Sequence, residues 1–479
     1  MMQYETVIGL EVHVQLSTRS KIFCADDAAF GGAPNTHISI ISTAMPGTLP
    51  RLNEKVVASA VKTGLAMGCH IDQASRFDRK NYFYPDLPKG YQITQDARPI
   101  CVGGSVRVGD RDIRIHHIHM EEDAGKSIHD QDPHFSFIDL NRAGVPLLEI
   151  VTQPDLRSAA ETAAFMDEIR RLVRWLGVSD GNMEEGSMRC DVNISVRPMG
   201  SAEFGQRCEI KNVNSMRFAR KAIEFEVARQ IELIENGGKV EQQTRGFDPS
   251  TGATYVQREK EHAHDYRYFP EPDLPPVIIS DEQLASIRAS MPTLPQEMAR
   301  TFTEQYQLPA YDAQVLTQER DTAEWFAQLI QGENAATAKA LANLTINKLL
   351  PWSAETGQSL DSCPVPTAHW KGFVQLIESG KMSASAANQK LFPAMLEQPT
   401  TPPDALAQSL QLIQSADTNF LENIVNDVIA RFPDKVLEYQ KGKKGLIGMF
   451  MGEIMKAAKG KAEPKATQAL LEEKLKSEE

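Results

Sequence analysis

Alternating apolar and polar positions near the N-terminus predict a β-strand. Within residues 6–16 the aliphatic side chains from Leu10 onward fall on every second position, and side chains two residues apart share a face of a strand. Glu11, His13 and Gln15 are therefore expected on one face, with the aliphatic side chains turned toward the core. Such a polar face either meets solvent or lines a site, and the alternation leaves both interpretations open.

Helical periodicity predicts two long helices in the first part of the chain. Ser158 with Glu161 three residues later has the spacing of a capping box, and apolar residues follow at helical spacing up to Gly177. A second helix is expected over residues 215–236, before two glycines. Strands are expected at residues 105–108, 113–118, 190–196, 208–212 and 276–279. Runs of strands between sparse helices predict an α+β fold with a largely antiparallel sheet.

The pattern becomes helical beyond residue 294. Short amphipathic helices are expected near residues 310–316, 321–330, 335–350 and 370–378, followed by a proline-rich linker at 398–404. We therefore predict three domains, at residues 1–293, 294–404 and 405–479, of which the last is a small helical unit.

Composition is that of an ordinary globular protein. The chain has 479 residues, 41% hydrophobic and 24% charged, with a net charge of −13. It shows neither a signal-peptide pattern nor a run of eighteen apolar residues, so a cytoplasmic protein without membrane spans is expected. Its six cysteines form no C-x-x-C pair, which predicts reduced, buried thiols rather than a disulfide framework.

Lysines concentrate near the C-terminus despite the acidic total. Residues 441–465 contain seven lysines and two glutamates, a local charge of +5. A solvated helix face explains this basic patch about as well as a polyanionic partner does. The candidate contacts to such a polyanion are Lys441, Lys443, Lys444, Lys456 and Lys459.

Residues 119–126, with the sequence HMEEDAGK, place three adjacent carboxylates beside a histidine and a lysine. Clustered carboxylates are tolerated when a hard cation neutralises them, so the pattern suggests Mg²⁺ and a phosphate ester. An acidic loop in water is the alternative for an isolated cluster. Glu149, an acid between apolar residues, is either a salt-bridge partner or a ligand.

Bases and aromatic residues are unusually dense over residues 77–92. Basic side chains there are candidates to hold phosphates, and the aromatic ones either stack on a base or ribose or belong to the core. The bases are Arg79, Lys80 and Lys89, and the aromatics are Tyr82, Phe83 and Tyr91.

Two further strands add charged faces. Arg189, Asp191 and Asn193 share one face of their strand, as do Glu209 and Lys211 on the next. Acids and bases gathered in this way are typical of an ATP-dependent ligase, in which cations bridge phosphates and basic groups stabilise the transferring phosphoryl group.

Several common chemistries lack their motifs. The GKS at residues 125–127 is not a Walker A loop, because Met120 stands where its first glycine is required. No H-E-x-x-H, G-x-S-x-G or G-x-G-x-x-G motif occurs in a suitable context, which argues against zinc proteases, hydrolase elbows and dinucleotide binding.

Six segments in order, residues 7–13, 77–92, 119–127, 183–193, 209–215 and 265–273, closely resemble the B subunits of the heterotrimeric aspartyl/glutamyl-tRNA amidotransferases (GatCAB). The resemblance spans essentially the whole chain. It implies a glutamine-synthetase-like cradle, a helical domain and a YqeY-like tail that contacts tRNA. It also implies ATP-dependent phosphorylation of glutamate on tRNA(Gln) or aspartate on tRNA(Asn), followed by attack of ammonia. The amidase (GatA) of the heterotrimer would supply the ammonia, with the small GatC protein as a clasp.

The resemblance also implies roles for particular residues. Glu11, His13 and Glu122 match the family's magnesium positions, with Glu121 or Asp191 as possible additional ligands. Lys80 lies where the family has a base in the cradle, and charge suggests that Lys80, Arg79 and Lys211 bind phosphates.

Many members of the family carry a cysteine zinc knuckle between the positions numbered about 24 and 46 here. This chain keeps only Cys24, with residues 42–45 (STAM) where the second pair would lie, so no structural zinc is expected.

Overall fold

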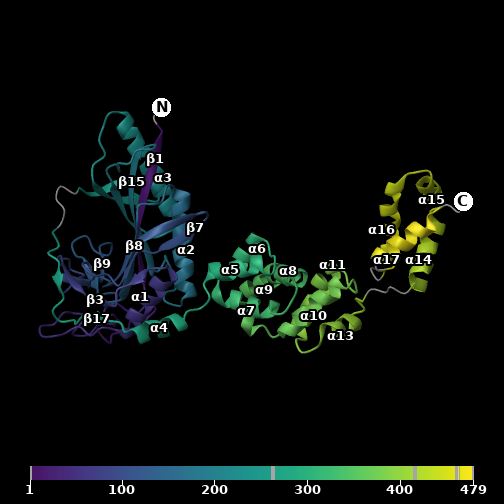
Figure 1. The fold of residues 1–479 in the computed structure, drawn as a ribbon, viewed down its shortest axis with the longest axis horizontal. Helices are drawn as coiled ribbons and strands as arrows, with labels where there is room; N and C mark the ends of the chain where they lie inside the picture. Colours follow the sequence, from purple (N-terminus) through teal and green to yellow (C-terminus); the bar gives the residue numbers. More distant parts are fainter. Residues whose placement is uncertain (1–2, 260–264, 414–417, 459–461, 463, 477–479) are drawn as a thin grey trace. The chain divides into compact units, whose positions relative to one another are not determined.

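The computed structural model describes residues 3–259, 265–413, 418–458, 462 and 464–476. The chain divides into two compact units, Met1–Pro295 and Gln296–Glu479, each considered by itself (Figure 1). No helix among the described residues has the length and apolar character needed to cross a membrane.

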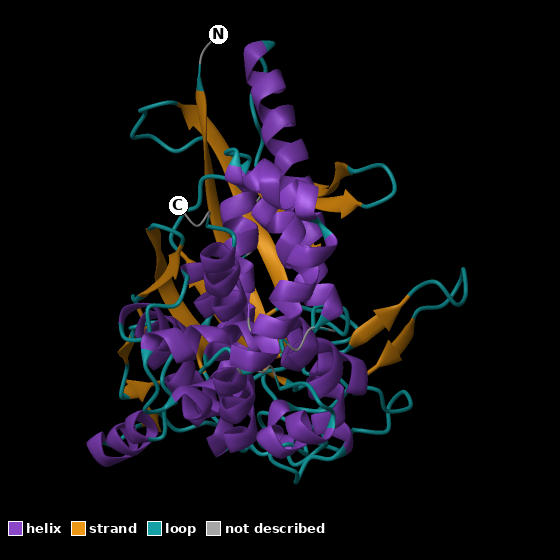
Figure 2. Cartoon of the chain, turned by 90° about the vertical axis from the view of Figure 1, so that its right-hand side faces the viewer, coloured by secondary structure: helices purple, strands orange, loops and turns teal. Residues whose placement is uncertain are grey.

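The first unit is built on a large sheet that, among the described residues, has ten strands (Figure 2, orange). Along its main path the order is β15-β14-β13-β12-β1-β11-β8-β6-β2, and β7 pairs with β8. Every described pairing is antiparallel except β13 with β14. The strands are β1 (Tyr4–Gln15), β2 (His70–Ile71), β6 (Cys101–Val102), β7 (Ser105–Val108), β8 (Arg111–Glu122), β11 (Pro146–Thr152), β12 (Met188–Pro198), β13 (Cys208–Val213), β14 (Gln243–Asp248) and β15 (Ala253–Glu259).

Smaller sheets and, among the described residues, four helices complete this unit. A three-stranded sheet has the order β16 (Phe269–Pro270), β4 (Asp78–Asn81), β5 (Tyr91–Thr94). Two strand pairs are β9 (Lys126–Ile128) with β10 (Phe137–Asp139), and β3 (Ala74–Ser75) with β17 (Val277–Ile278). The helices are α1 (Glu54–Ala66), α2 (Ala159–Trp175), α3 (Met216–Glu235) and α4 (Asp281–Ala289).

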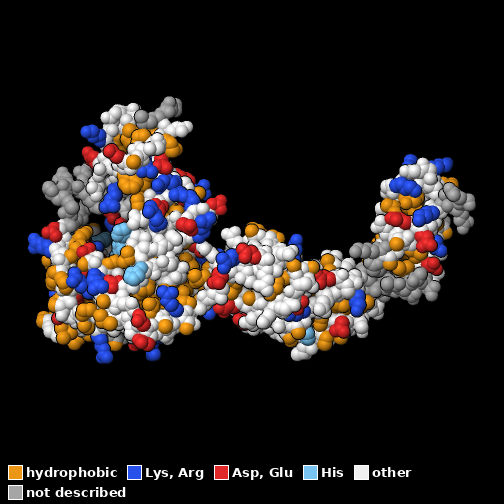
Figure 3. Space-filling model, in the orientation of Figure 1, with side chains coloured by type: hydrophobic (Ala, Val, Ile, Leu, Met, Phe, Trp, Pro, Cys, Tyr) orange, Lys and Arg blue, Asp and Glu red, His pale blue; other side chains and the backbone are white. Residues whose placement is uncertain are grey.

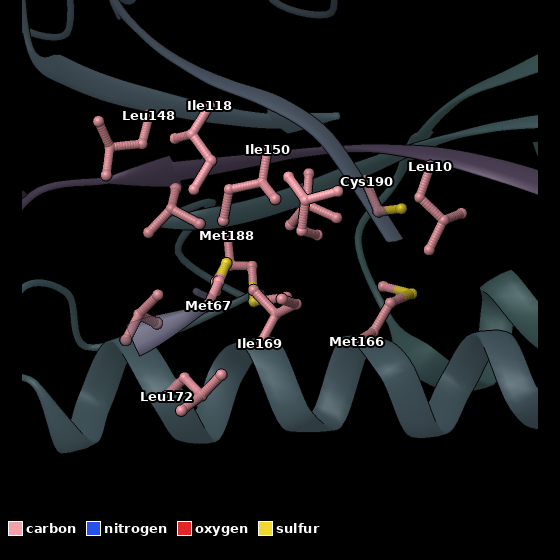
Figure 4. Packing of buried hydrophobic residues seen from close by; sticks show 14 of the residues in the cluster. Leu10, Met67, Ile118, Leu148, Ile150, Met166, Ile169, Leu172, Met188 and Cys190 are labelled. Atoms are coloured by element: carbon pink, nitrogen blue, oxygen red, sulfur yellow. The ribbon is translucent and has the colours of Figure 1, made fainter. Parts of the chain in front are cut away.

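One face of the large sheet packs against α2 to form the core. Leu10, Ile118 and Ile150 from the sheet and Met166 and Ile169 from α2 are fully buried or nearly so, and they meet in Figure 4. The alternation predicted for the first strand is confirmed, because Leu10, Val12 and Val14 are buried there while their polar neighbours turn to the other face.

The expected capping box on α2 forms only in part. The Ser158 hydroxyl accepts a hydrogen bond from the backbone N–H of Glu161, as an N-cap should. The Glu161 carboxylate, however, accepts from the backbone N–H of Arg157 and pairs with Arg111 instead of closing the box. The hydrogen bond from the Ser158 backbone N–H to the Glu161 carboxylate, which would complete the box, is therefore replaced by these two contacts.

The second unit is helical, and its described residues pack around separate apolar clusters. The larger cluster, with Phe326, Leu341 and Trp370 at its centre, involves α5 (Pro295–Glu304), α6 (Ala310–Leu316), α7 (Arg320–Ile330), α8 (Ala335–Leu344), α9 (Leu350–Thr356), α10 (Thr367–Glu378), α11 (Ala384–Ala386), α12 (Phe392–Glu397), α13 (Pro403–Ser409) and the short 3₁₀ helix Leu360–Ser362. A further cluster, with Val425 and Phe450, lies among α14 (Thr418–Arg431), α15 (Pro433–Gln440), the 3₁₀ turn Lys444–Leu446, α16 (Ile447–Ala457) and α17 (Pro464–Lys474).

Two π-helical segments interrupt the larger helical cluster, Thr345–Leu349 and Ala387–Leu391. Each is followed two residues later by a proline, Pro351 or Pro393, within a shared Lys-Leu-apolar-Pro sequence. Proline lacks an N–H and its ring clashes with the carbonyl four residues earlier, so a wider turn relieves both problems. The same local combination of a π-helical turn and a following proline therefore occurs twice in this cluster.

Candidate active site on the polar face of the sheet

Polar side chains from neighbouring strands meet on the face of the large sheet opposite α2. Across β1, Glu11 lies opposite Asp191 of β12, and His13 lies opposite Glu149 of β11. Glu149 in turn lies opposite His119 of β8. Residues directly opposite one another in antiparallel strands share a face, so the register alone gathers these groups.

The first group consists of two histidines and two glutamates. The Nε2 of His13 lies 3.3 Å from Oε2 of Glu149 and 3.8 Å from Oε1 of Glu121. The Nε2 of His119 lies 3.3 Å from Glu149 and 3.4 Å from Glu121. Both carboxylates therefore sit between the same two imidazoles, and all four residues come from rigid strands.

Attraction between the imidazoles and the carboxylates outweighs burial in setting the pKa values of His13, His119 and Glu149. Burial disfavours the imidazolium of His13, but the nearby Glu149 and Glu121 outweigh burial and raise the pKa of His13 to about 9. In His119 the same opposition of burial and the two carboxylates raises the pKa to about 10. The two histidines, working against burial, hold the pKa of Glu149 well below its usual range. Without a cation, both imidazoles carry a proton at neutral pH.

The second group consists of Glu11, Asp191 and Glu209, whose carboxylate oxygens lie within 4.8 Å of one another. The Nζ of Lys211 is 2.9 Å from Asp191 and 2.9 Å from Glu209. The Asn193 amide donates to Glu11 at 2.9 Å. Burial, followed by the charge of the neighbouring acids, raises the pKa of Glu11, whereas Asp191 and Glu209 outweigh burial and raise the pKa of Lys211.

A hollow of about 250 Å³ opens over both groups. Lys80 of β4 and Tyr82, which directly follows that strand, line it, and Arg189 lines it from β12. Figure 3 shows histidine side chains gathered at the rim of a hollow in the first unit. Arg189 is itself held by Asp123, 2.8 Å away.

The donor atoms of both groups suit divalent cations. His13, Glu121 and Glu149 offer one imidazole nitrogen and two carboxylates within 4.8 Å of one another, a set that fits Mg²⁺ or Mn²⁺. The second group offers carboxylates only, which is the preference of Mg²⁺. Cations in these positions would also relieve the repulsion that raises the pKa of Glu11.

Comparison with known proteins identifies the family. Residues 6–285 match the family described as "GatB/GatE catalytic domain", and residues 324–475 match the "GatB domain". The chain belongs to the GatB family. Both groups of candidate ligands lie within the part that matches the GatB/GatE catalytic domain.

Curated relatives match along nearly the entire chain. A protein of Thermodesulfovibrio yellowstonii, named as the B subunit of an aspartyl/glutamyl-tRNA(Asn/Gln) amidotransferase, is 47% identical, covering 98% of this chain and 99% of the relative. Proteins with the same name from Myxococcus xanthus and Trichlorobacter lovleyi are each 48% identical, covering 98% and 99% of this chain and 98% and 100% of themselves.

Most residues that the sequence proposes for this GatB-family site do come together. Glu11, His13 and Asp191 lie side by side on the polar face, and Lys211 bridges the second group. Lys80 lines the same hollow, although its Nζ faces aromatic rings rather than an acid. Their assignment to cations and phosphates stays a prediction.

Glu122 is not among them, and its expected grouping with Glu11 and His13 is wrong. Residues 119–122 continue β8 instead of forming an acidic loop, so Glu121 and Glu122 point to opposite faces. Glu121 joins His13, whereas Glu122 pairs with Lys89 and accepts from the backbone N–H of Ile93 at 2.8 Å. Glu122 lines a different pocket of about 250 Å³, beside Phe23 and Tyr91.

Arg79 also lies apart from the hollow, on the other face of β4 from Lys80. Its guanidinium pairs with Glu271 at 2.7 Å and with Asp273 at 3.0 Å, and it lies 4.2 Å from the ring centroid of Tyr91. Glu271 is buried and directly follows β16, which pairs with β4. The ion pair with Arg79 of β4 therefore helps to hold these two strands together. The structure therefore places Arg79 in a structural ion pair rather than with Lys80 and Lys211.

Four of the five candidate tRNA lysines, Lys441, Lys443, Lys444 and Lys456, are exposed, and Lys459 lies outside the described residues. Lys443 pairs with Glu438 at 3.1 Å. The expectation for cysteines holds for four of the six, because Cys24 and Cys363 are only partly buried. Cys24 lies 3.6 Å from the Ser42 hydroxyl.

Sequence reasoning does not identify three members of the site as ligands. The pattern leaves Glu149 between two roles, gives His119 none, and places Glu209 only on a charged face. A signal is present in β8, because His119 and Glu121 are two residues apart, but the strand expected at residues 113–118 ends before both of them.

Proposed function

We propose that this chain is the kinase and transamidase subunit of a tRNA-dependent amidotransferase. Its substrates are the side-chain carboxylates of Glu-tRNA(Gln), Asp-tRNA(Asn) or both, and its products are Gln-tRNA(Gln) and Asn-tRNA(Asn). The observation that carries this proposal is the pair of ligand groups on one face of the sheet, in a chain whose curated relatives bear the name of that enzyme's B subunit.

The chemistry runs in two steps. A carboxylate oxygen of the tRNA-linked amino acid attacks the γ-phosphorus of ATP, the bond to the β-γ bridging oxygen breaks, and ADP leaves. Ammonia then attacks the acyl carbon, the bond to the phosphate oxygen breaks, and inorganic phosphate and a proton leave. Activation is needed because a carboxylate is a poor electrophile, and an acyl phosphate splits the difficult step into two easier ones.

The side chains of the polar face have distinct tasks. When bound, Mg²⁺ would neutralise phosphate oxygens and polarise the transferring group. His13, Glu121 and Glu149 would hold one ion, and Glu11, Asp191 and Glu209 the other. Lys211 keeps the second set of carboxylates in place through its two ion pairs.

Lys80 projects a positive charge into the hollow and is suited to the γ-phosphate or to the developing acyl phosphate. Its Nζ lies over two tyrosine rings, and these cation–π contacts hold the ammonium group in place. Lys80 is therefore the basic residue we assign to the transferring phosphoryl group.

The nucleoside of ATP has a suitable place next to the second ligand group. A pocket of about 450 Å³ is lined by Glu11 and Asn193 together with Phe204 and Arg207. Glu11 lines both this pocket and the hollow over the ligand groups. An aromatic ring and polar side chains are what an adenosine requires, so ATP would reach from this pocket toward the carboxylates.

We further propose the division of the chain into a glutamine-synthetase-like cradle at 1–293, a helical domain at 294–404 and a tRNA-contacting tail at 405–479. The separate apolar clusters of the helical part support the last boundary. Ammonia would come from a partner amidase, with a small third protein completing the enzyme.

The test is co-expression with a candidate amidase and a candidate small partner, followed by assay on both misacylated tRNAs. Glu-tRNA(Gln) or Asp-tRNA(Asn) should be amidated only with ATP, and uncharged tRNA should not stimulate ATP cleavage. Substrate labelled with ¹⁸O in the side-chain carboxylate should deliver label to inorganic phosphate.

Each alternative leaves a different result in the same assay. A free-standing ligase for a small acid would turn over without tRNA or partner proteins. An RNA-binding scaffold would bind tRNA and cleave no ATP. Amidation with no label in phosphate would contradict the acyl-phosphate route itself.

A further inference from the structure

Four tyrosines form a continuous row beside the hollow. Ring centroids are 5.8 Å apart between Tyr84 and Tyr82, 6.0 Å between Tyr82 and Tyr266, and 6.0 Å between Tyr266 and Tyr268. Each contact is edge to face, with interplanar angles of 66° to 72°. We call these four residues the tyrosine row.

The two ends of the row are open to solvent. Tyr84 is 57% exposed and Tyr268 is 40% exposed, whereas Tyr82 and Tyr266 between them are only partly accessible. Aromatic side chains with this much exposed surface gain little from the core. The row therefore presents aromatic surface at both ends while its middle is fixed by packing.

The backbone that carries the row is held by hydrogen bonds. The backbone N–H of Asn81 donates to the carbonyl of Tyr266 at 2.9 Å, and the Asn81 amide donates to the carbonyl of Arg267 at 2.9 Å. Arg267 has a φ of +47°, a left-handed conformation that a non-glycine residue adopts at a cost. The strained backbone of Arg267 lies between Tyr266 and Tyr268, whose rings are in contact. Backbone strain is typically retained at functional sites, so this segment is a candidate for function.

A positive charge lies at the middle of the row. The Nζ of Lys80 is 5.0 Å from the ring centroid of Tyr266 and 5.8 Å from that of Tyr82. Lys80 and Tyr82 also line the hollow over the candidate cation ligands, and the Tyr82 hydroxyl donates to Gln92, another lining residue, at 3.4 Å. The row thus leads to the place where phosphoryl transfer is assigned.

We propose that the tyrosine row binds the unpaired 3′-terminal nucleotides of the aminoacyl-tRNA, with bases stacked on the exposed rings of Tyr84 and Tyr268. This inference rests on the proposed function, and it adds the surface that brings the esterified amino acid to the hollow. The amino acid is attached to the terminal ribose of the tRNA, so the last nucleotides must lie within reach of the reacting carboxylate.

Two features favour a nucleic acid over a protein partner. Single-stranded nucleic acid is typically bound by aromatic rings that stack on bases, with basic groups nearby. The row supplies the rings, and the Nζ of Lys80 lies over two of them. Stacking on an aromatic ring depends little on which base is stacked. It therefore suits a 3′ end that is common to both candidate tRNAs. A protein partner needs no cation in the middle of the row and no connection to the hollow.

The test uses the complex co-expressed with its partner proteins and two forms of uncharged tRNA, intact or lacking the 3′-terminal trinucleotide. Tyr84→Leu and Tyr268→Leu remove stacking, and Tyr84→Phe and Tyr268→Phe restore a ring. Phe135→Leu is the control, because Phe135 is 69% exposed in the same unit but outside the row. Thermal unfolding checks that each variant is folded.

The wild-type complex should bind intact tRNA about 5-fold or more tightly than trimmed tRNA, in keeping with one stacked base. The two tyrosine-to-leucine variants should lose most of this difference, and the phenylalanine variants and Phe135→Leu should keep it. With misacylated tRNA, the leucine variants should show a raised KM with a smaller change in kcat.

Equal sensitivity to trimming in wild type and leucine variants would overturn the proposal, as would a wild type that binds tRNA but ignores trimming. Leucine variants that lose a partner protein, with tRNA recognition intact, would overturn it in favour of a protein-docking surface. Failure of the proposed function is distinguishable, because then the wild-type complex would not amidate misacylated tRNA, whether or not trimming changes its affinity for tRNA.

Discussion

The two faces of the large sheet are made by the same strands, yet they have opposite properties. On one face Leu10, Ile118 and Ile150 are fully buried or nearly so against α2. On the other face their immediate neighbours Glu11, His119 and Glu149 stand within reach of further acids and bases. A shift of one position along a strand changes a core residue into a candidate ligand.

The contrast separates what stabilises the fold from what the fold positions. Apolar packing on one side holds the strands in register, and the register places like-charged carboxylates within 4.8 Å of one another on the other side. Groups that repel one another are costly to assemble, so the apolar face sustains an arrangement that the polar face alone would not. Substitutions on the two faces should therefore fail in different ways.

The largest effect is expected from Glu149→Gln on the polar face. Glu149 contacts both His13 and His119, so neutralising it should lower kcat for amidation on the order of 1000-fold, as removal of a key electrostatic group does. Circular dichroism should show an intact fold. Asp112→Asn is the control, since this carboxylate on the same strand as His119 is exposed. Near-normal activity of Glu149→Gln would contradict the claim that the polar face carries the activity.

The next effect belongs to the apolar face, one position along the same strand. Ile150→Ala should lower the free energy of unfolding by about 2–5 kcal/mol, because Ile150 is fully buried. Ile150→Val should cost only about 0.5–1.5 kcal/mol. Denaturant unfolding measures both, and activity per folded molecule should stay close to that of wild type. A specific loss of activity with little loss of stability would show that the faces are not separable.

The pH dependence of stability sharpens the comparison. The pKa values of His13 and His119 are raised to about 9 and about 10 in the folded chain, above the ordinary 6.5. Their stabilisation is fully present below pH 6.5 and is lost as pH rises through 9 to 10. With cations removed by a chelator, the free energy of unfolding should fall by several kcal/mol between pH 6.5 and 10. Glu149→Gln should flatten this profile, and an unchanged slope would exclude the carboxylate as its cause.

The smallest effect is expected on a surface that serves neither packing nor the site. Lys443→Glu with Lys444→Glu should weaken tRNA binding several-fold at moderate salt, because phosphate contacts depend on local cations. Stability should change by less than about 0.5 kcal/mol, since both lysines are exposed. Lys381→Glu with Lys390→Glu makes the same charge change at exposed positions elsewhere. Equal tRNA affinity in both double variants would exclude the patch.

Local pattern predicted much of this fold. The alternation of the first strand placed Glu11 and His13 on one face, and helical spacing placed the long helices close to α2 and α3. These features depend on periods of two and 3.6 residues, which are visible in a single sequence. The mixed fold with a largely antiparallel sheet follows from the same patterns.

The order in which the strands pair could not be predicted from local sequence patterns. The sequence left Glu149 between salt-bridge partner and ligand and gave Glu209 no role as a ligand. Both join the candidate groups because β11 and β13 lie next to β1 and β12, and nothing local specifies that order. Glu121 and Glu122 were indistinguishable as a charge cluster, and only the continuation of β8 through both assigns them to different faces. Arg79 matched a phosphate-binding pattern because its partner Glu271 is distant in sequence.

Counting bound Mn²⁺ tests the central claim most directly. Calorimetric titration of the assembled complex should find two ions in the chain's site, one for each ligand group, with Glu121→Gln losing one of them. Glu122→Gln should keep both, because Glu122 lies on the other face with Lys89. Loss of an ion from Glu122→Gln but not from Glu121→Gln would contradict the account, as would a wild-type complex that binds none.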